Sequence, residues 1–341
     1  MSLAVQIDLK DASSFPSRRV ETWKYSDLRR YLRDAPQPSG TAVVDRPGPF
    51  DALGGEAIVL ANGRPVGATD FIASGRQTLR LRYISDADGT GHTASARISA
   101  REGAQLLILE SHEGRGGAYV AHNRLDIDVA PGAEVTRLVL VEEPEQAISV
   151  MNADVRLAPG GRYRQTVVAT GAKLQRIETQ VLHGGQGADA RIDGLYVLDG
   201  ARQTDLTSVV DHAKPDGTTS QLIKGAARSD GARGVFQGKI VVRRGADGTD
   251  ARMGHHALIA SDRAEIDAKP ELIIYADDVQ CAHGNTIGTL DEQALFYIQQ
   301  RGLSADEARA LLTQAFLIEV VDRIEAEDAR EVVREWLTAR L

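Results

Sequence analysis

Cysteine is almost missing from this sequence. Its 341 residues contain one cysteine, Cys281, which excludes a disulfide within the chain. A single thiol also excludes a metal site built from several thiolates of this chain alone, because iron-sulfur and structural zinc sites use up to four. The cysteine usage therefore predicts a protein of the reducing cytoplasm.

Several other features that would mark a function class are also absent. No apolar run at the amino terminus resembles a signal peptide or a membrane span. The net charge of −8 disfavours nucleic acid or an anionic membrane as the main partner. The phosphate loop G-x-x-x-x-G-K-[ST], H-E-x-x-H and G-x-S-x-G do not occur, so we expect no ATP hydrolysis and no enzyme of these classes.

Aromatic residues are sparse, at 5%, whereas 33 glycines are present. From about Phe50 to Asp291 the sequence consists of short β-type runs, with clear alternation at 79–83 and 125–129. Glycine turns recur in this region at intervals of 29, 28 and 27 residues, at Gly103, Gly132, Gly160 and Gly187. Repeated β units with a turn in fixed phase predict a stacked solenoid, and a β-sandwich or jelly roll stays open as the alternative.

The two ends of the chain differ from this β region. Residues 1–49 are predicted to form an amino-terminal segment in which Trp23 docks against the core and Ser26 caps a short helix, followed by a proline-rich linker. Residues 50–290 form the β core. In residues 291–341 the apolar period changes to about 3.6, and Ser304 with Glu307 makes a capping box, so a helical domain is expected.

The residues with the clearest chemistry lie just before those helices. Cys281 and His283 are two apart in a β-type stretch, and positions i and i+2 of a strand share one face. A thiolate and an imidazole suit iron, zinc or an iron-sulfur centre, but two ligands do not complete a four-coordinate site. The missing ligands must come from another chain or from the cargo.

The sequence around this pair is similar to a known family. Pro270-Glu271-Leu272 and the run from Asp277 to Gly284 resemble the carboxyl-terminal signature of SufD-type chains in the SufB/SufD family of iron-sulfur cluster assembly proteins. Trp23-Lys24-Tyr25-Ser26 and Phe236-Gln237-Gly238-Lys239 extend the resemblance towards the amino terminus. The family is built on a right-handed parallel β-helix, so the resemblance favours the solenoid.

The resemblance also implies a role as a non-catalytic scaffold. Such a chain pairs with a SufB-like subunit, and it binds a SufC-like ATPase through residues 291–341. Candidate contacts for the ATPase are Arg301, Leu311, Leu312 and Phe316. A reduced flavin is associated with the assembled system only, and the isolated chain could pair with itself.

By the same resemblance, His283 is a ligand of a transient iron-sulfur cluster shared with SufB, and Cys281 supports it. Asp277 and Asp278 would orient the imidazole from outside the ligand set. No role is assigned to His212, His255 or His256. Because His255 and His256 are adjacent, we expect them to face opposite sides of a strand.

Two other interpretations are kept. The chain could be a SufB-type subunit that takes up sulfur, which the lack of a second cysteine opposes. It could instead be an enzyme in which Cys281 is a nucleophile and His283 its base, although no orienting third group is evident.

Overall fold

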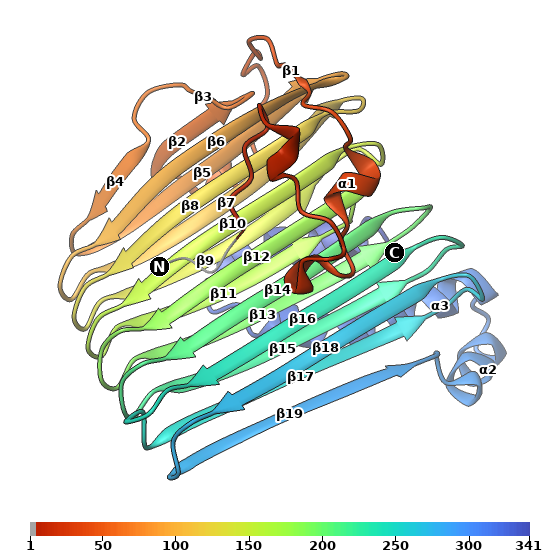
Figure 1. The fold of residues 1–341 in the computed structure, drawn as a ribbon. Helices are drawn as coiled ribbons and strands as arrows, with labels where there is room; N and C mark the ends of the chain where they lie inside the picture. The colour runs from red at the N-terminus through yellow and green to blue at the C-terminus, as the bar shows by residue number, and fades with distance from the viewer. Residues whose placement is uncertain (1–4) are drawn as a thin grey trace.

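A computed structural model describes residues 5–341 and shows a parallel β-helix made of two facing sheets (Figure 1). From residue 70 onward consecutive strands alternate between the sheets, and each strand pairs in parallel with the strand one coil later. Val150, for example, lies beside Arg176. This arrangement confirms the predicted solenoid and excludes the sandwich, whose strands pair antiparallel.

The two sheets are built as follows. Sheet A contains β1 (Gln37–Pro38), β4 (Asp70–Ala73), β6 (Thr90–Ala100), β8 (Val120–Val129), β10 (Ile148–Leu157), β12 (Leu174–His183), β14 (Gln203–His212), β16 (Arg233–Val242) and β18 (Glu265–Ile274). Sheet B contains β2 (Glu56–Ala61), β3 (Arg64–Pro65), β5 (Arg76–Ala87), β7 (Gln105–Gly116), β9 (Glu134–Glu142), β11 (Arg162–Ala169), β13 (Asp189–Leu198), β15 (Thr218–Ala227), β17 (Thr249–Ile259) and β19 (Val279–Gly288).

The recurring glycines mark equivalent turns of successive coils. Gly103, Gly132, Gly160 and Gly187 have φ angles of 67°, 63°, 64° and 66°. This left-handed conformation costs glycine little because it has no Cβ. The amide of Gly103 donates to the carbonyl of Pro131 at 3.2 Å, and that of Gly132 donates to Pro159 at 3.1 Å, so the turns are hydrogen-bonded to one another. The interval of 27 to 29 residues between these glycines is therefore the length of one coil of the β-helix.

Aliphatic side chains stack in register through the interior. One such ladder runs through sheet A as Ile98, Ile127, Val155, Val181, Val210 and Ile240, all buried. The sheets lie close enough for branched side chains to fill the space between them, which explains why few aromatic residues are needed.

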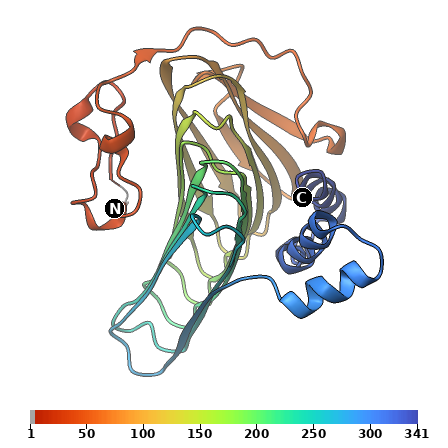
Figure 2. The same cartoon turned by 90° about the vertical axis from the view of Figure 1, so that its right-hand side faces the viewer.

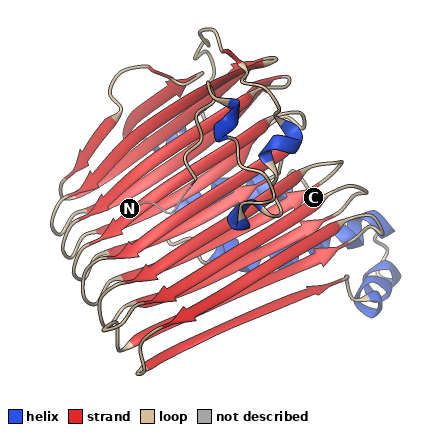
Figure 3. Cartoon of the chain, in the orientation of Figure 1, coloured by secondary structure: helices blue, strands red, loops and turns tan. Residues whose placement is uncertain are grey.

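Helices lie only on the outer faces of the two sheets in the described part of the chain (Figure 3). α2 (Glu292–Gln300), α3 (Ala305–Asp322) and α4 (Glu327–Thr338) lie on the side of sheet B (Figure 2). Leu317, Val320 and Val333 form an apolar cluster with outward residues of that sheet. Ser304 and Glu307 make the predicted capping box at the start of α3. None of these helices is both long enough and apolar enough to span a membrane, and the same holds for every helix among residues 5–341.

The amino-terminal segment packs on the outer face of sheet A. It consists of three short helices, η1 (Ala12–Ser14), η2 (Glu21–Trp23) and α1 (Leu28–Tyr31). Trp23 is 1% exposed, and the guanidinium carbon of Arg176 lies 4.5 Å from its ring centre. The docking interpretation of this segment is therefore confirmed.

Ser26 does not cap α1, which corrects the prediction. Asp27 is the cap, with its side chain accepting from the amide of Arg30. The Ser26 hydroxyl instead donates to the buried carboxylate of Asp205. This bond to a carboxylate holds the Ser26 side chain against sheet A, and the next residue, Asp27, provides the cap.

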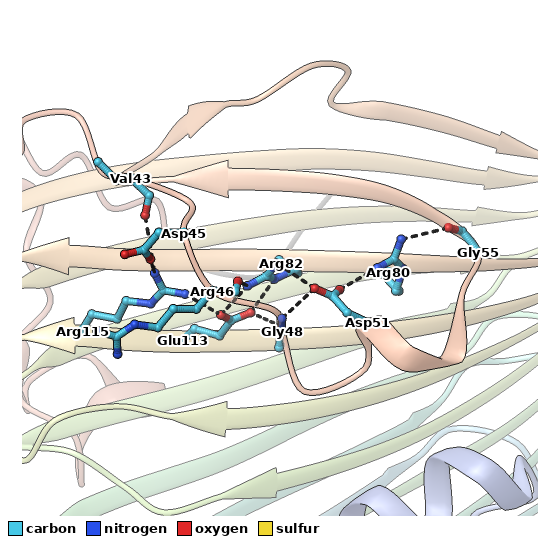
Figure 4. A network of polar contacts seen from close by, with 11 residues as sticks. Val43, Asp45, Arg46, Gly48, Asp51, Gly55, Arg80, Arg82, Glu113 and Arg115 are labelled. Carbon is cyan, nitrogen blue, oxygen red and sulfur yellow. Dashed lines mark hydrogen bonds and ion pairs between the residues drawn. The ribbon is translucent and has the colours of Figure 1, made fainter.

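The proline-rich stretch before β2 crosses the end of the β-helix from the side of sheet A to the side of sheet B (Figure 2). An ionic network fixes it there (Figure 4). Asp51, in η3 (Asp51–Leu53), pairs with Arg80 at 2.6 Å and with Arg82 at 3.1 Å. Arg82 also donates to Glu113 at 2.7 Å and to the carbonyl of Arg46 at 2.9 Å. The linker is thus held against sheet B.

Candidate functional site

The last coil of the β-helix is open. β18 pairs only with β16 and β19 only with β17, and β19 forms the outermost strand in Figure 1. Every residue of β19 is half-exposed or exposed. Among residues 5–341 no further coil covers this end, so both edges and the inner face of the last coil reach solvent.

The strand register shows which side chains of β19 point inward. Cys281 lies beside Ala251 and His283 beside Met253, and both neighbours belong to the buried core. Because alternate residues of a strand share a face, Cys281, His283 and Asn285 all lie on the inner face. The expected common direction of the thiol and the imidazole is confirmed. His283 is exposed only because no coil follows.

The thiol of Cys281 is not activated. Burial raises its pKa, the charge of Asp250 raises it further, and the backbone of Ala251 opposes both effects. A raised thiol pKa keeps the sulfur protonated, which is the opposite of what a nucleophilic cysteine needs. In the described part of the chain, no hydrogen bond joins Cys281 to His283, and the enzyme interpretation gains no support.

The site is also incomplete as a metal site. Residues 5–341 contain no group of three or more histidine, cysteine, aspartate or glutamate side chains placed to hold a metal ion. The imidazole of His283 makes no hydrogen bond or ion pair to another described residue. Its nitrogens are therefore free to accept a ligand.

Asp277 and Asp278 are not brought to the imidazole. Both are exposed in the turn that precedes β19, and the carbonyl of Asp278 accepts from the amide of Gly248 at 2.7 Å. His283 lies five positions after Asp278, a distance of about 16 Å along an extended chain.

His255 and His256 point to opposite sides of β17, as expected. Nδ1 of His255 lies 2.7 Å from Oδ1 of Asn285, and Nδ1 of His256 lies 2.7 Å from the hydroxyl of Thr286. His212 is buried, with its ring 4.1 Å from that of His183, and the Thr219 hydroxyl lies 2.9 Å from its Nε2.

The sequence-based reasoning missed Asn285. The signal was available, since the alternation that pairs Cys281 with His283 reaches Asn285 after one more step.

The helical candidates divide into two groups. Leu311 is exposed and Leu312 is half-buried. Phe316 faces sheet B, where the ammonium of Lys224 lies 4.4 Å from its ring centre. Arg301, at the end of α2, is exposed, and its guanidinium donates to the Tyr297 hydroxyl at 2.7 Å.

Phe296, which was not among the candidates, is 64% exposed on the same helix as Tyr297. We call Phe296, Tyr297, Arg301 and Leu311 the α2–α3 surface.

Comparison with known proteins decides the family. A family model described as "SUF system FeS cluster assembly, SufBD core domain" matches residues 83–316. The chain belongs to the SufBD family. This match begins in β5 and runs through the open coil into α3, so both the β-helix and the Cys281–His283 strand fall within the SufBD core.

Individual SufBD relatives agree with this assignment. The chain is 29% identical to SufD of Escherichia coli, over 91% of this chain and 76% of that protein. It is 32% identical to a SufBD family protein of Synechocystis, over 78% of this chain and 61% of that protein. A SufBD family protein of Mycobacterium tuberculosis is 25% identical over 97% of this chain and 89% of its own length. The resemblance seen in the motifs is thereby confirmed.

Proposed function

We propose that this SufBD-family chain is a non-catalytic scaffold that offers one half of an iron-sulfur cluster site to a SufB-like partner. The observation that carries the proposal is the open terminal coil, in which His283 and Cys281 face inward at an end that no described residue covers. The cluster is the cargo of this site.

The coordination chemistry requires a second subunit. Iron in a cluster prefers thiolate and imidazole ligands, and β19 offers one of each, Cys281 and His283. His283 is the ligand that we propose, because it is exposed and its ring makes no hydrogen bond or ion pair to another described residue that would have to break. Cys281 is half-buried with a raised pKa, so it supports the site and becomes a ligand only if metal displaces its proton.

The edges of the open coil provide a means of pairing. β18 and β19 each leave one row of backbone N–H and C=O groups without a neighbouring strand in the described structure, and such edges pair readily with strands of another chain. Exposed apolar side chains lie on or next to them, at Ile274, Tyr275 and Ile287. A SufB-like chain with a matching open coil fits this end, and a second copy of the present chain would use the same edges in its absence.

The α2–α3 surface is the proposed contact for a SufC-like ATPase. Phe296, Tyr297 and Leu311 are large apolar side chains that are exposed on these helices, and exposed apolar surface is typical of docking sites. Phe316 is withdrawn from this role because it already packs against sheet B. A reduced flavin, if one takes part, belongs to the assembled complex.

Substitution of Ile287 tests the pairing. We expect that Ile287→Arg reduces co-purification of a SufB-like chain by at least about ten-fold, because it places a charge in the apolar part of the proposed interface. The measurement is quantitative capture of separately tagged SufB-like and SufC-like chains from the same organism, with retained SufC-like binding showing that the fold is intact.

The matched control is Ile72→Arg. Ile72 is 58% exposed and Ile287 is 43% exposed, and both lie on edge strands, but Ile72 lies in β4, far from the open coil. Equal capture of the SufB-like chain by both variants would refute pairing through this end.

A further inference from the structure

A chain of hydrogen bonds connects the buried core to the open coil. The Tyr196 hydroxyl lies 3.1 Å from Nε2 of His255, and Nδ1 of His255 lies 2.7 Å from Oδ1 of Asn285. Tyr196 and His255 are fully buried, and the ring of Phe236 stacks on that of His255 with centres 5.0 Å apart. Asn285, in contrast, is exposed. The exposed side chain of Asn285 is thus held in place by two buried side chains, those of His255 and Tyr196.

The direction of each hydrogen bond follows from the chemistry of the groups. Oδ1 of an asparagine can only accept, so Nδ1 of His255 carries the ring proton and Nε2 accepts from Tyr196. Burial lowers the pKa of His255 to about 4, so the ring is neutral near pH 7, with one donor and one acceptor. Both ring nitrogens are satisfied.

This arrangement fixes the amide plane of Asn285 and leaves its other half available. Nδ2 lies on the opposite side of the planar amide from Oδ1, and within residues 5–341 no group accepts a hydrogen bond from it. The side chain shares the inner face of β19 with His283, about 7 Å along the strand. Two N–H donors are therefore presented beside the proposed ligand.

We infer that Asn285 donates an N–H hydrogen bond to a sulfur atom of the cluster held at His283, and that His255 and Tyr196 position it. The inference rests on the proposed function, since it concerns the same site. Sulfide and thiolate sulfurs of clusters accept such bonds, which stabilise the more reduced, more negative cluster and so influence its reduction potential.

The opposite face of the strand offers an internal comparison. His256 and Thr286 form a contact of the same 2.7 Å length one residue further along, but His256 is only half-buried and faces away from the core. Both contacts join β17 to β19 at neighbouring positions of one strand register. If substitutions of Asn285 and Thr286 differ in their effect on the cluster, the difference must therefore arise from the face of the strand on which each side chain lies.

The test uses the complex of this chain with its SufB-like and SufC-like subunits, loaded anaerobically with iron and sulfide. Asn285→Leu and Asn285→Asp are compared with Thr286→Ala, and the readouts are the reduction potential of the cluster and its rate of loss to an iron chelator. Asn285→Asp keeps the acceptor for His255 but lacks the N–H donor. We expect both Asn285 variants to lose the cluster about ten-fold faster, as for one charge-assisted hydrogen bond, and to shift the potential to more negative values.

Thr286→Ala should match the unmodified complex in both readouts. An unchanged potential and loss rate in Asn285→Leu overturns the inference. His283→Ala, measured in parallel, separates the two claims: loss of cluster in His283→Ala with an unchanged Asn285→Leu refutes the hydrogen bond alone. Retention of the full cluster in His283→Ala refutes the proposed function, and an unchanged Asn285→Leu in that same series refutes both.

Discussion

Replacing Arg137 by methionine is expected to lower the free energy of unfolding by about 3–5 kcal/mol, the usual cost of breaking a buried ion pair. Arg137 and Glu110 are 3% and 1% exposed and face each other inside the β-helix. The guanidinium donates to both carboxylate oxygens at 2.8 Å and to the side-chain oxygen of Gln165 at 2.9 Å.

The cost arises because Glu110 would be left behind without its partner. Burial alone would raise the pKa of Glu110, but the charge of Arg137 and the hydrogen bonds from His112 and Arg137 lower it to about 2. Without Arg137 the buried carboxyl group keeps only its contact with His112 at 2.6 Å, so it must either take up a proton or remain charged without the arginine that compensates it, and both outcomes cost free energy.

Urea denaturation at pH 7 measures this effect, and two further variants sharpen it. Arg156→Met removes an arginine that pairs with Asp128 at 2.5 Å but is 46% exposed, so it should cost less than about 1 kcal/mol. The double variant Arg137→Met/Glu110→Leu should recover much of the loss because no unpaired charge remains. If Arg137→Met cost no more than Arg156→Met, the interior pair would not stabilise the fold.

Acidification is expected to unfold the protein between about pH 6.5 and pH 4. Four histidines have pKa values lowered to about 4, and burial is the main cause in each. They are His92, His122, His212 and His255. In the unfolded chain these groups bind protons near pH 6.5. Their contribution is therefore fully present above pH 6.5 and is lost as the pH falls through the folded pKa.

The size of the effect follows from linkage. A depression of about 2.5 pKa units corresponds to roughly 3 kcal/mol for one histidine at full protonation, and four such groups approach the whole stability of a typical domain. The measurement is urea denaturation at a series of pH values, which gives the midpoint and the free energy of unfolding at each pH. His122→Gln should reduce the slope of the free energy of unfolding against pH, near pH 5, by up to about 1.4 kcal/mol per pH unit, the value for one proton. A midpoint that stayed constant from pH 7 to pH 4.5 would contradict this result.

Features of the fold with a local or periodic signature could be predicted from the sequence. The glycine intervals equal the length of one coil because each coil needs the same left-handed turn. The capping box at Ser304 depends on residues three apart, and the shared face of Cys281 and His283 depends on strand alternation alone. Turn conformation, helix capping and strand alternation depend on residues close together in the sequence, so they can be predicted without knowledge of tertiary contacts.

Contacts between distant residues could not be predicted in this way. The Ser26 hydroxyl donates to Asp205, which lies 179 residues away in the sequence. Local sequence preferences do not reveal that this carboxylate, and not the start of a helix, binds the serine side chain. Phe316 fits the apolar stripe of a helix equally well whether it faces a partner or sheet B. The support of Asn285 by His255 arises from the register between β17 and β19, which a single sequence does not state.

The exposure of the candidate site has a similar origin. His283 occupies a position that is buried one coil earlier, where Met253 belongs to the core. An inward-facing residue reaches solvent only because the stack ends at β19. The resemblance to a family indicated which residues to consider, and the structure shows why an inward-facing position is accessible to solvent.

We propose that the open coil holds a cluster through His283 once a partner closes over it. The most direct measurement is the iron and sulfide bound by the complex with SufB-like and SufC-like subunits when it contains His283→Ala, with His256→Ala on the outer face as the control. We expect His283→Ala to assemble the same complex and to retain less than about a tenth of the cluster, because loss of even an outer-shell partner of a metal ligand costs roughly 10- to 100-fold in affinity, while His256→Ala retains it. Full cluster content in an intact His283→Ala complex would contradict the account.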